Sequence, residues 1–167
     1  MDYAQIITVF GIALPVCATV LAWFWKTHHE RKAVKVALIA EILALRDIAT
    51  IRQYVKELLA IADDLKALPE ADRQVRKYQV SVPEHYCRVY IANVSRLGAL
   101  KLIDANLIVR FYQFADSVIR DVAPNGLLYE GTTDPEDFER NAHILTLAVD
   151  IANELERRNP MQGAGAS

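Results

Sequence analysis

The sequence predicts an all-α protein with an N-terminal single transmembrane helix followed by an antiparallel four-helix bundle. Residues 6–25 form an uncharged, apolar run of 20 residues, which as a helix would cover about 30 Å, the thickness of the hydrocarbon core of a bilayer. The rest of the 167-residue chain repeats apolar residues every three or four positions, as an amphipathic helix does. We therefore expect an anchor over 1–26, a cytoplasmic helical bundle over 27–159 and a disordered tail over 160–167.

The run 6–25 does not match other kinds of hydrophobic segment. A secretory signal peptide has a basic start and a small-residue cleavage site, whereas here the charge before the run is acidic and the run ends in Trp23-Phe24-Trp25. A core helix would be expected to carry a polar face, and none is visible. We favour membrane insertion over a core helix.

Charges beside the run predict its orientation. The tail before it carries only Asp2, and a basic cluster follows it. This cluster contains Lys26, Arg31, Lys32 and Lys35. Basic flanks stay on the cytoplasmic side, and Trp23 and Trp25 suit the headgroup level of a membrane helix. We expect a single-pass protein with its N-terminus outside and its C-terminal domain in the cytoplasm.

Helix boundaries can be read from capping and breaking residues. One long helix is expected over 27–68, since no Pro or Gly interrupts it before Pro69. The stretch 69–82 breaks the helical period. Residues 81–84, Ser-Val-Pro-Glu, resemble a capping box that starts the next helix, and Gly98 is expected to end it as a left-handed C-cap.

Two further helices are expected in the second half of the chain. Asp104 begins one that closes at Pro124, before the turn signal Asn125-Gly126. Residues 133–136, Thr-Asp-Pro-Glu, form a second capping box, and the last helix ends before Pro160. The first and last helices also carry apolar residues beside the main stripe, namely Val36, Ile39, Leu43, Leu59, Ile144, Leu147 and Ile151. Such a wide stripe fits either a central position in the bundle or self-association.

Charge and cysteine content exclude some classes of function. Only four of the 19 basic and two of the 21 acidic residues precede residue 36, so the remainder has a net charge of −4. Nucleic acid is therefore not an expected partner, because phosphate contacts need a basic surface. The two cysteines, Cys17 in the run and Cys87 beyond it, form no disulfide framework.

Candidate chemistry is sparse. His28 and His29 are adjacent, so on a helix they point about 100° apart and do not chelate together; we expect no metal and no cofactor. Arg140 and His143 resemble the Arg-polar-x4-His motif of HEPN ribonucleases, which are also helical bundles. Here only two residues separate Arg from His, where that family has four or more. These two residues are the only catalytic candidates.

One segment resembles a known group of proteins. Tyr90, Asn93 and Gly98, followed by Phe111 and Tyr112, fit a pattern Y-x-x-N-x-x-x-LG-x-L…IV-x-FY. The pattern is similar to one in small uncharacterised bacterial proteins with an N-terminal membrane helix. The resemblance covers about 25 residues, implies a bacterial inner (plasma) membrane location and carries no known activity. From the residues alone, the aromatic rings are expected to fill the core, and Asn93 to fix the register between helices or to contact a ligand.

These observations favour a non-catalytic, membrane-anchored helical module for interaction or assembly. Its expected partners are the lipid bilayer and either a second copy of the chain or another protein. The alternative is a membrane-associated effector, either a HEPN-like ribonuclease or a toxin-like pore. A bundle that binds a small ligand between its helices is a third possibility.

Overall fold

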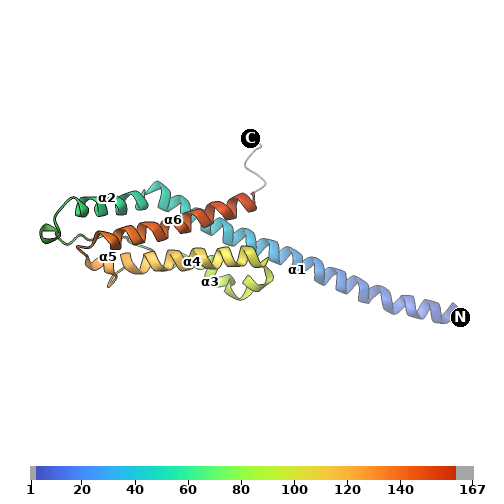
Figure 1. Cartoon of the computed structure of the whole chain (residues 1–167). Helices are drawn as coiled ribbons and strands as arrows, with labels where there is room; N and C mark the ends of the chain where they lie inside the picture. Colours follow the sequence, from blue (N-terminus) through green and yellow to red (C-terminus); the bar gives the residue numbers. More distant parts are fainter. Residues whose placement is uncertain (1–2, 161–167) are drawn as a thin grey trace. The chain divides into compact units, whose positions relative to one another are not determined.

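The computed structural model describes the backbone of residues 3–160 and the side chains of Trp25 and residues 28–160. The chain divides into two compact units, Met1–Val36 and Ala37–Ser167, called the N-terminal unit and the C-terminal unit below. The all-α prediction is confirmed, because every regular element in the described backbone is a helix (Figure 1). The elements are α1 (Tyr3–Ile51), α2 (Tyr54–Lys66), η1 (Glu70–Asp72), α3 (Arg88–Asn93), η2 (Val94–Ala99), α4 (Leu102–Val122), α5 (Leu127–Glu130) and α6 (Pro135–Arg158).

The predicted membrane helix is not tested by the side chains that the structure describes. Among the described residues, none of the helices combines the length and the apolar character needed to cross a membrane. The backbone of 6–25 belongs to α1. Among the side chains of residues 6–26, Lys26 included, the structure describes only that of Trp25. Of the predicted tail over 160–167, residues 161–167 lie outside the described part too. The anchor therefore remains a prediction.

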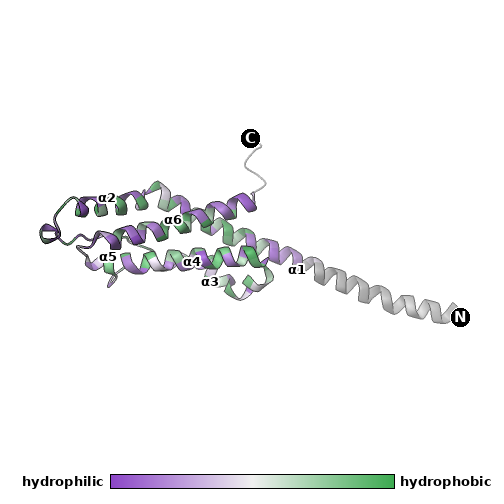
Figure 2. Cartoon of the chain, in the orientation of Figure 1, coloured by the Kyte–Doolittle hydropathy of each residue, from purple (hydrophilic) through white to green (hydrophobic). Residues whose placement is uncertain are grey.

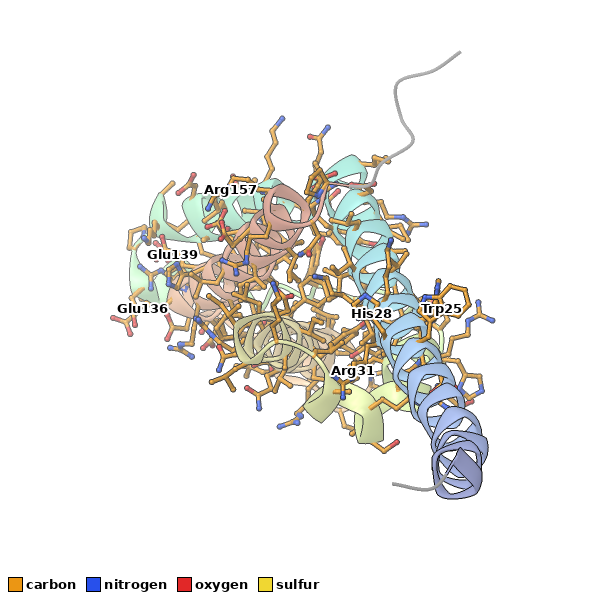
Figure 3. All side chains as sticks on the ribbon, turned by 90° about the vertical axis from the view of Figure 1, so that its right-hand side faces the viewer. Trp25, His28, Arg31, Glu136, Glu139 and Arg157 are labelled. Carbon is orange, nitrogen blue, oxygen red and sulfur yellow. The ribbon has the colours of Figure 1, made fainter. Side chains whose placement is uncertain are left out.

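The basic flank of the predicted anchor lies on α1. Figure 2 shows a hydrophilic stretch of α1 directly after the grey residues, and Figure 3 places Trp25, His28 and Arg31 along this helix. The Trp25 ring meets His29 edge-on, with 5.3 Å between the ring centroids, and is 72% exposed. An exposed tryptophan beside cationic residues suits the headgroup level of a membrane.

The prediction of one continuous helix over 27–68 is wrong, because α1 ends at Ile51 and a separate helix, α2, starts at Tyr54. Gln53 between them has a left-handed backbone, with φ of 55°. The Thr50 hydroxyl donates to the carbonyl oxygen of Arg46, a contact that bends helices. Ile51, which the uninterrupted pattern would bury, is 78% exposed. No Pro or Gly marks this break, so the residue pattern conceals it.

In the C-terminal unit, α6 packs against both α2 and α4. Lys66, the last residue of α2, pairs with Glu139 in the second turn of α6. Asp104 in the first turn of α4 pairs with Arg158 at the end of α6. Both pairs join a late residue of one helix to an early residue of the other, so α6 runs antiparallel to α2 and to α4 (Figure 1).

The helix expected after Pro83 is much shorter than predicted. The capping box at 81–84 is not used as a helix start; residues 84–87 form turns, and α3 begins at Arg88. Gly98 lies in η2 and has no positive φ, so the prediction of a left-handed C-cap there is wrong. The fourth long helix of the predicted bundle is consequently not confirmed.

Local signals place the start of α6 within one residue. The predicted capping box would make Thr133 the N-cap, whereas Asp134 is the N-cap and accepts a hydrogen bond from the backbone N–H of Glu136, with Pro135 in the first turn. The helix ends at Arg158, before Pro160, as predicted. The turn signal before it is also confirmed, since Asn125 adopts a positive φ of 70°.

One end of the C-terminal unit holds a compact apolar core. The buried residues of this core are Leu58, Ala62, Leu65, Val118, Val122, Leu128, Phe138 and Ala142. Extended backbone covers it: the Tyr78 N–H donates to the carbonyl oxygen of Leu128, and Arg76 and Thr132 exchange two backbone hydrogen bonds. Gly131 permits this close approach, because its φ is 104° and a Cβ there would lie 2.6 Å from a methyl of Val75.

The apolar residues beside the main stripe are partly buried within the chain itself. Ile39 and Leu43 on α1, and Ile151 on α6, are buried in the C-terminal unit. Val36 and Leu59 remain exposed. Three of the seven apolar residues beside the main stripe are thus buried within the chain, as a central position in the bundle would require. A second copy of the chain is not needed to cover these three.

Candidate functional site

A cavity of about 510 Å³ opens in the middle of the C-terminal unit. Its walls come from four parts of the chain: the last turns of α1 with the start of α2, the segment 78–88, the second half of α4 and the middle of α6. Apolar side chains dominate the walls. They include Leu45, Ile48, Leu58, Val80, Phe111, Val118, Ile119, Val122, Leu145 and Val149. Ligand pockets in proteins are typically of this size and this apolar character.

The break between α1 and α2 helps to form the cavity. Ile48, Arg52 and Tyr54 flank the left-handed Gln53 and all line the cavity. Leu58, which follows the break on α2, lines the cavity and is also buried in the apolar core. The cavity is therefore a product of packing between distant segments.

Two tyrosines of the segment 78–88 face the cavity with their hydroxyls already paired. The Tyr78 hydroxyl donates to Glu57 at 2.7 Å, and that of Tyr86 donates to Asp116. Burial, and then the carboxylate that accepts each hydrogen bond, raises the pKa of both tyrosines. Both phenols thus stay neutral at physiological pH and present ring surface to the cavity.

Cationic groups line the same cavity. Arg46 already has partners within the protein. It donates to Asn153 and to Glu156 of α6, and the hydrogen bond to Glu156 raises its pKa. Arg52 and Arg88 are exposed, and neither forms an ion pair with another described residue. The cavity thus combines apolar walls with two guanidinium groups that have no carboxylate partner in the described part.

The one carboxylate of the cavity lining accepts three hydrogen bonds from the protein itself. Glu41 of α1 accepts hydrogen bonds from the backbone N–H groups of Val89 and Tyr90, at 2.8 and 2.9 Å, and from the Tyr112 hydroxyl at 2.6 Å. Val89 and Tyr90 lie in the first turn of α3, where helical N–H groups lack partners. Glu41 therefore caps α3 from a different helix. Burial and this carboxylate raise the pKa of Tyr112.

The aromatic residues of the pattern at 90–112 come together around Glu41. The rings of Tyr90 and Tyr112 stack with centroids 3.9 Å apart, and the Phe111 ring meets Tyr112 edge-on. Phe111 also lines the cavity. Cys87, directly before α3, is buried, and burial raises its pKa, which leaves it a poor nucleophile.

The asparagine that joins helices is Asn141. It is 1% exposed and donates to Asp121 of α4 at 2.9 Å, so it links α6 to α4. Asn93 instead donates to the carbonyl oxygen of Val89 within its own helix. The sequence did carry a signal for Asn141, because it lies within the apolar stripe between Phe138 and Leu145.

The catalytic candidates lie away from the cavity. Arg140 and His143 are both exposed on α6, and Arg140 pairs with Asp137 at 3.1 Å. Neither residue lines the cavity. Within the described side chains, no cluster of three or more His, Cys, Asp or Glu could hold a metal ion.

Comparisons with protein-family models, with curated proteins and with solved structures find no significant match to this chain. The resemblance of residues 90–112 to small bacterial membrane proteins therefore stays a prediction.

Proposed function

We propose that this chain is a membrane-anchored, non-catalytic binding module whose C-terminal unit takes up an amphipathic anion with an apolar tail. The anchor over 6–25, the cytoplasmic side of the C-terminal unit and the bacterial inner membrane are parts of the same proposal. A bilayer is a natural source of such ligands, and tethering at its surface raises the local concentration of the module there.

One observation carries the proposal: an apolar cavity of about 510 Å³ is lined by two arginines, Arg52 and Arg88, that form no ion pair with another described residue. Ile48, Phe111 and Val149 offer apolar walls for an acyl chain. Arg52 and Arg88 offer guanidinium groups for a carboxylate, which is a charge-assisted and often bidentate contact. Glu41 directs its carboxylate oxygens to the first turn of α3 and to Tyr112.

The burial of Ile39, Leu43 and Ile151 favours ligand binding over self-assembly. These residues belong to the stripes on which assembly was predicted, and the chain covers them itself. The exposed positions of Arg140 and His143 give no support to a ribonuclease.

The test is photolabelling of the full chain in lipid vesicles with a diazirine-bearing dodecanoic acid. Labelled peptides are expected from the walls of the cavity, at 45–58, 78–88 and 111–122. Ala49→Trp should abolish this labelling because Ala49 lines the cavity. Ala60→Trp is the matched control, since Ala60 is an exposed residue of α2 outside the lining.

The charge of the ligand is tested separately. The double variant Arg52→Gln, Arg88→Gln should weaken labelling by the acid by about tenfold or more, as expected for the loss of charge-assisted contacts. Labelling by the corresponding alcohol should change little. Labels confined to residues 3–25, or equal labelling of Ala49→Trp and the unmodified chain, would contradict the proposal.

A further inference from the structure

A second surface of the C-terminal unit combines exposed apolar residues with uncompensated basic charge. It lies where α3, η2 and the first turn of α4 contact one another. Ile91 and Leu102 are 62% and 86% exposed, and Val94 and Ile103 are each 49% exposed. Soluble surfaces rarely gather so many large aliphatic side chains within 13 consecutive residues, and such clusters mark sites of interaction. We call residues 88–103 the apolar corner.

The apolar corner is basic on a unit that is acidic as a whole. Residues 88–103 contain Arg88, Arg96 and Lys101 and not a single Asp or Glu, although the chain beyond residue 35 has a net charge of −4. All three basic residues are exposed, and none of them pairs with a carboxylate in the described part of the chain.

Nearby acidic groups are already paired within the unit. Asp104, which follows the corner, pairs with Arg158, and Glu154 pairs with Arg157 and Arg158. Glu156 pairs with Arg46. The net charge that the corner presents is therefore positive, and its complement is an anionic surface.

The corner lies at the end of the C-terminal unit where the chain enters from residue 36. Glu41, four residues into this unit, holds the start of the corner through Val89 and Tyr90. Eleven residues, 26–36, separate the predicted membrane run from this unit, so the twelve steps from residue 25 to residue 37 span at most about 43 Å when fully extended. The covalent chain thus limits how far the start of the C-terminal unit can lie from the predicted run.

From these observations we propose that the apolar corner docks on the surface of an anionic membrane. Ile91, Val94, Leu102 and Ile103 enter the boundary between headgroups and acyl chains, while Arg96 and Lys101 contact lipid phosphates. Amphipathic segments bind bilayers through this combination of apolar burial and attraction to anionic lipid. The corner shares Arg88 with the ligand cavity, but the residues proposed to contact lipid do not line the cavity. Docking would fix which side of the C-terminal unit faces the membrane.

The loop at the opposite end of the unit provides an internal control. It also exposes an apolar and a basic residue, with Val75 59% exposed beside the exposed Arg76. It includes Glu70 and Asp72, however, and Arg73 donates to the carbonyl oxygen of Leu65 at the end of α2. This loop should not bind lipid.

Amide hydrogen exchange on the full chain tests the proposal in two kinds of vesicle, phosphatidylcholine alone and phosphatidylcholine with phosphatidylglycerol. Amides of 88–103 are expected to exchange about tenfold more slowly in the anionic vesicles, and amides of 68–77 equally in both. Leu102→Ser, or Arg96→Gln with Lys101→Gln, should remove the difference. Val75→Ser should leave it intact.

Three results would overturn the proposal. One is equal exchange of 88–103 in both vesicles. Another is protection that rises with protein concentration rather than with anionic lipid, because that would identify a second copy as the occupant. A third is an unaltered difference in the Leu102→Ser variant. A failure of photolabelling in the cavity would leave this surface unaffected, so the two proposals can fail separately.

Discussion

The two ends of the C-terminal unit are held together in different ways. The distal end, residues 62–80 and 122–142, is closed by an apolar core around Phe138 and by backbone hydrogen bonds between extended segments. The proximal end, residues 37–41, 88–104 and 154–158, also buries apolar side chains on α1 and α6, such as Leu38 and Leu155. Its segment 88–104, however, is attached through polar contacts, notably those of Glu41 and the Asp104–Arg158 pair, and exposes Ile91 and Leu102. A segment held by few polar contacts can present a surface to a partner, whereas the closed distal end supplies stability.

The largest effect is expected from Glu41 at the proximal end. Glu41→Ala should lower the free energy of unfolding by about 2–3 kcal/mol, because three donors lose their charged acceptor. Amides of α3 should lose protection while those of α2 keep theirs. Urea denaturation and hydrogen exchange measure the two effects.

Glu57→Ala is the matched control for Glu41, since Glu57 accepts only the Tyr78 hydroxyl at an exposed position. Its cost should be about 1 kcal/mol or less. If the two substitutions cost the same and α3 stays protected, the proximal end does not depend on Glu41.

A glycine at each end sharpens the comparison. Gly131→Ala at the distal end should cost about 1–3 kcal/mol, because alanine resists a φ of 104° and its Cβ would meet Val75. Gly98→Ala at the proximal end should be nearly neutral, as no atom lies within 4 Å of a Cβ there. Thermal denaturation of both variants measures the contrast, and an equal loss of stability in both would refute it.

The paired tyrosines are expected to have the smallest effect on the free energy of unfolding at neutral pH. Their effect becomes visible only at alkaline pH. The folded chain raises the pKa of Tyr78, Tyr86 and Tyr112 above the ordinary value, so the folded state holds these protons more tightly than the unfolded state. The resulting stability is complete below pH about 10 and is lost as the pH rises further.

Urea midpoints at increasing alkaline pH measure this loss. Tyr112→Phe should make the decline shallower, because one of the phenols with a raised pKa no longer titrates. A decline that is equally steep in Tyr112→Phe would contradict the assignment.

The sequence predicted what adjacent residues determine. The start of α6 at Asp134 and Pro135, its end before Pro160, and the turn at Asn125 all follow from local capping and turn chemistry. The sequence did not predict the break at Gln53, which has no Pro or Gly, or the start of α3. The start of α3 depends on Glu41, which is 47 positions before Arg88 and was visible only as an acidic residue in an apolar stripe.

The cavity could not be predicted for the same reason. Its walls come from 41–58, 78–88, 111–122 and 145–149, and their arrangement depends on the break between α1 and α2. Each of its apolar residues reads in the sequence as ordinary core. The pattern at 90–112 did identify Tyr90 and Tyr112 as packing partners before their stacking was visible, because both lie on apolar helix faces.

The central claim is that the C-terminal unit holds an amphipathic anion between its helices. Hydrogen exchange of the full chain in vesicles, with and without dodecanoate, tests this claim most directly. Slower exchange is expected at 45–58, 78–88 and 111–122, with no change around Phe138 in the distal core. Exchange that dodecanoate leaves unchanged in all three segments would contradict the claim.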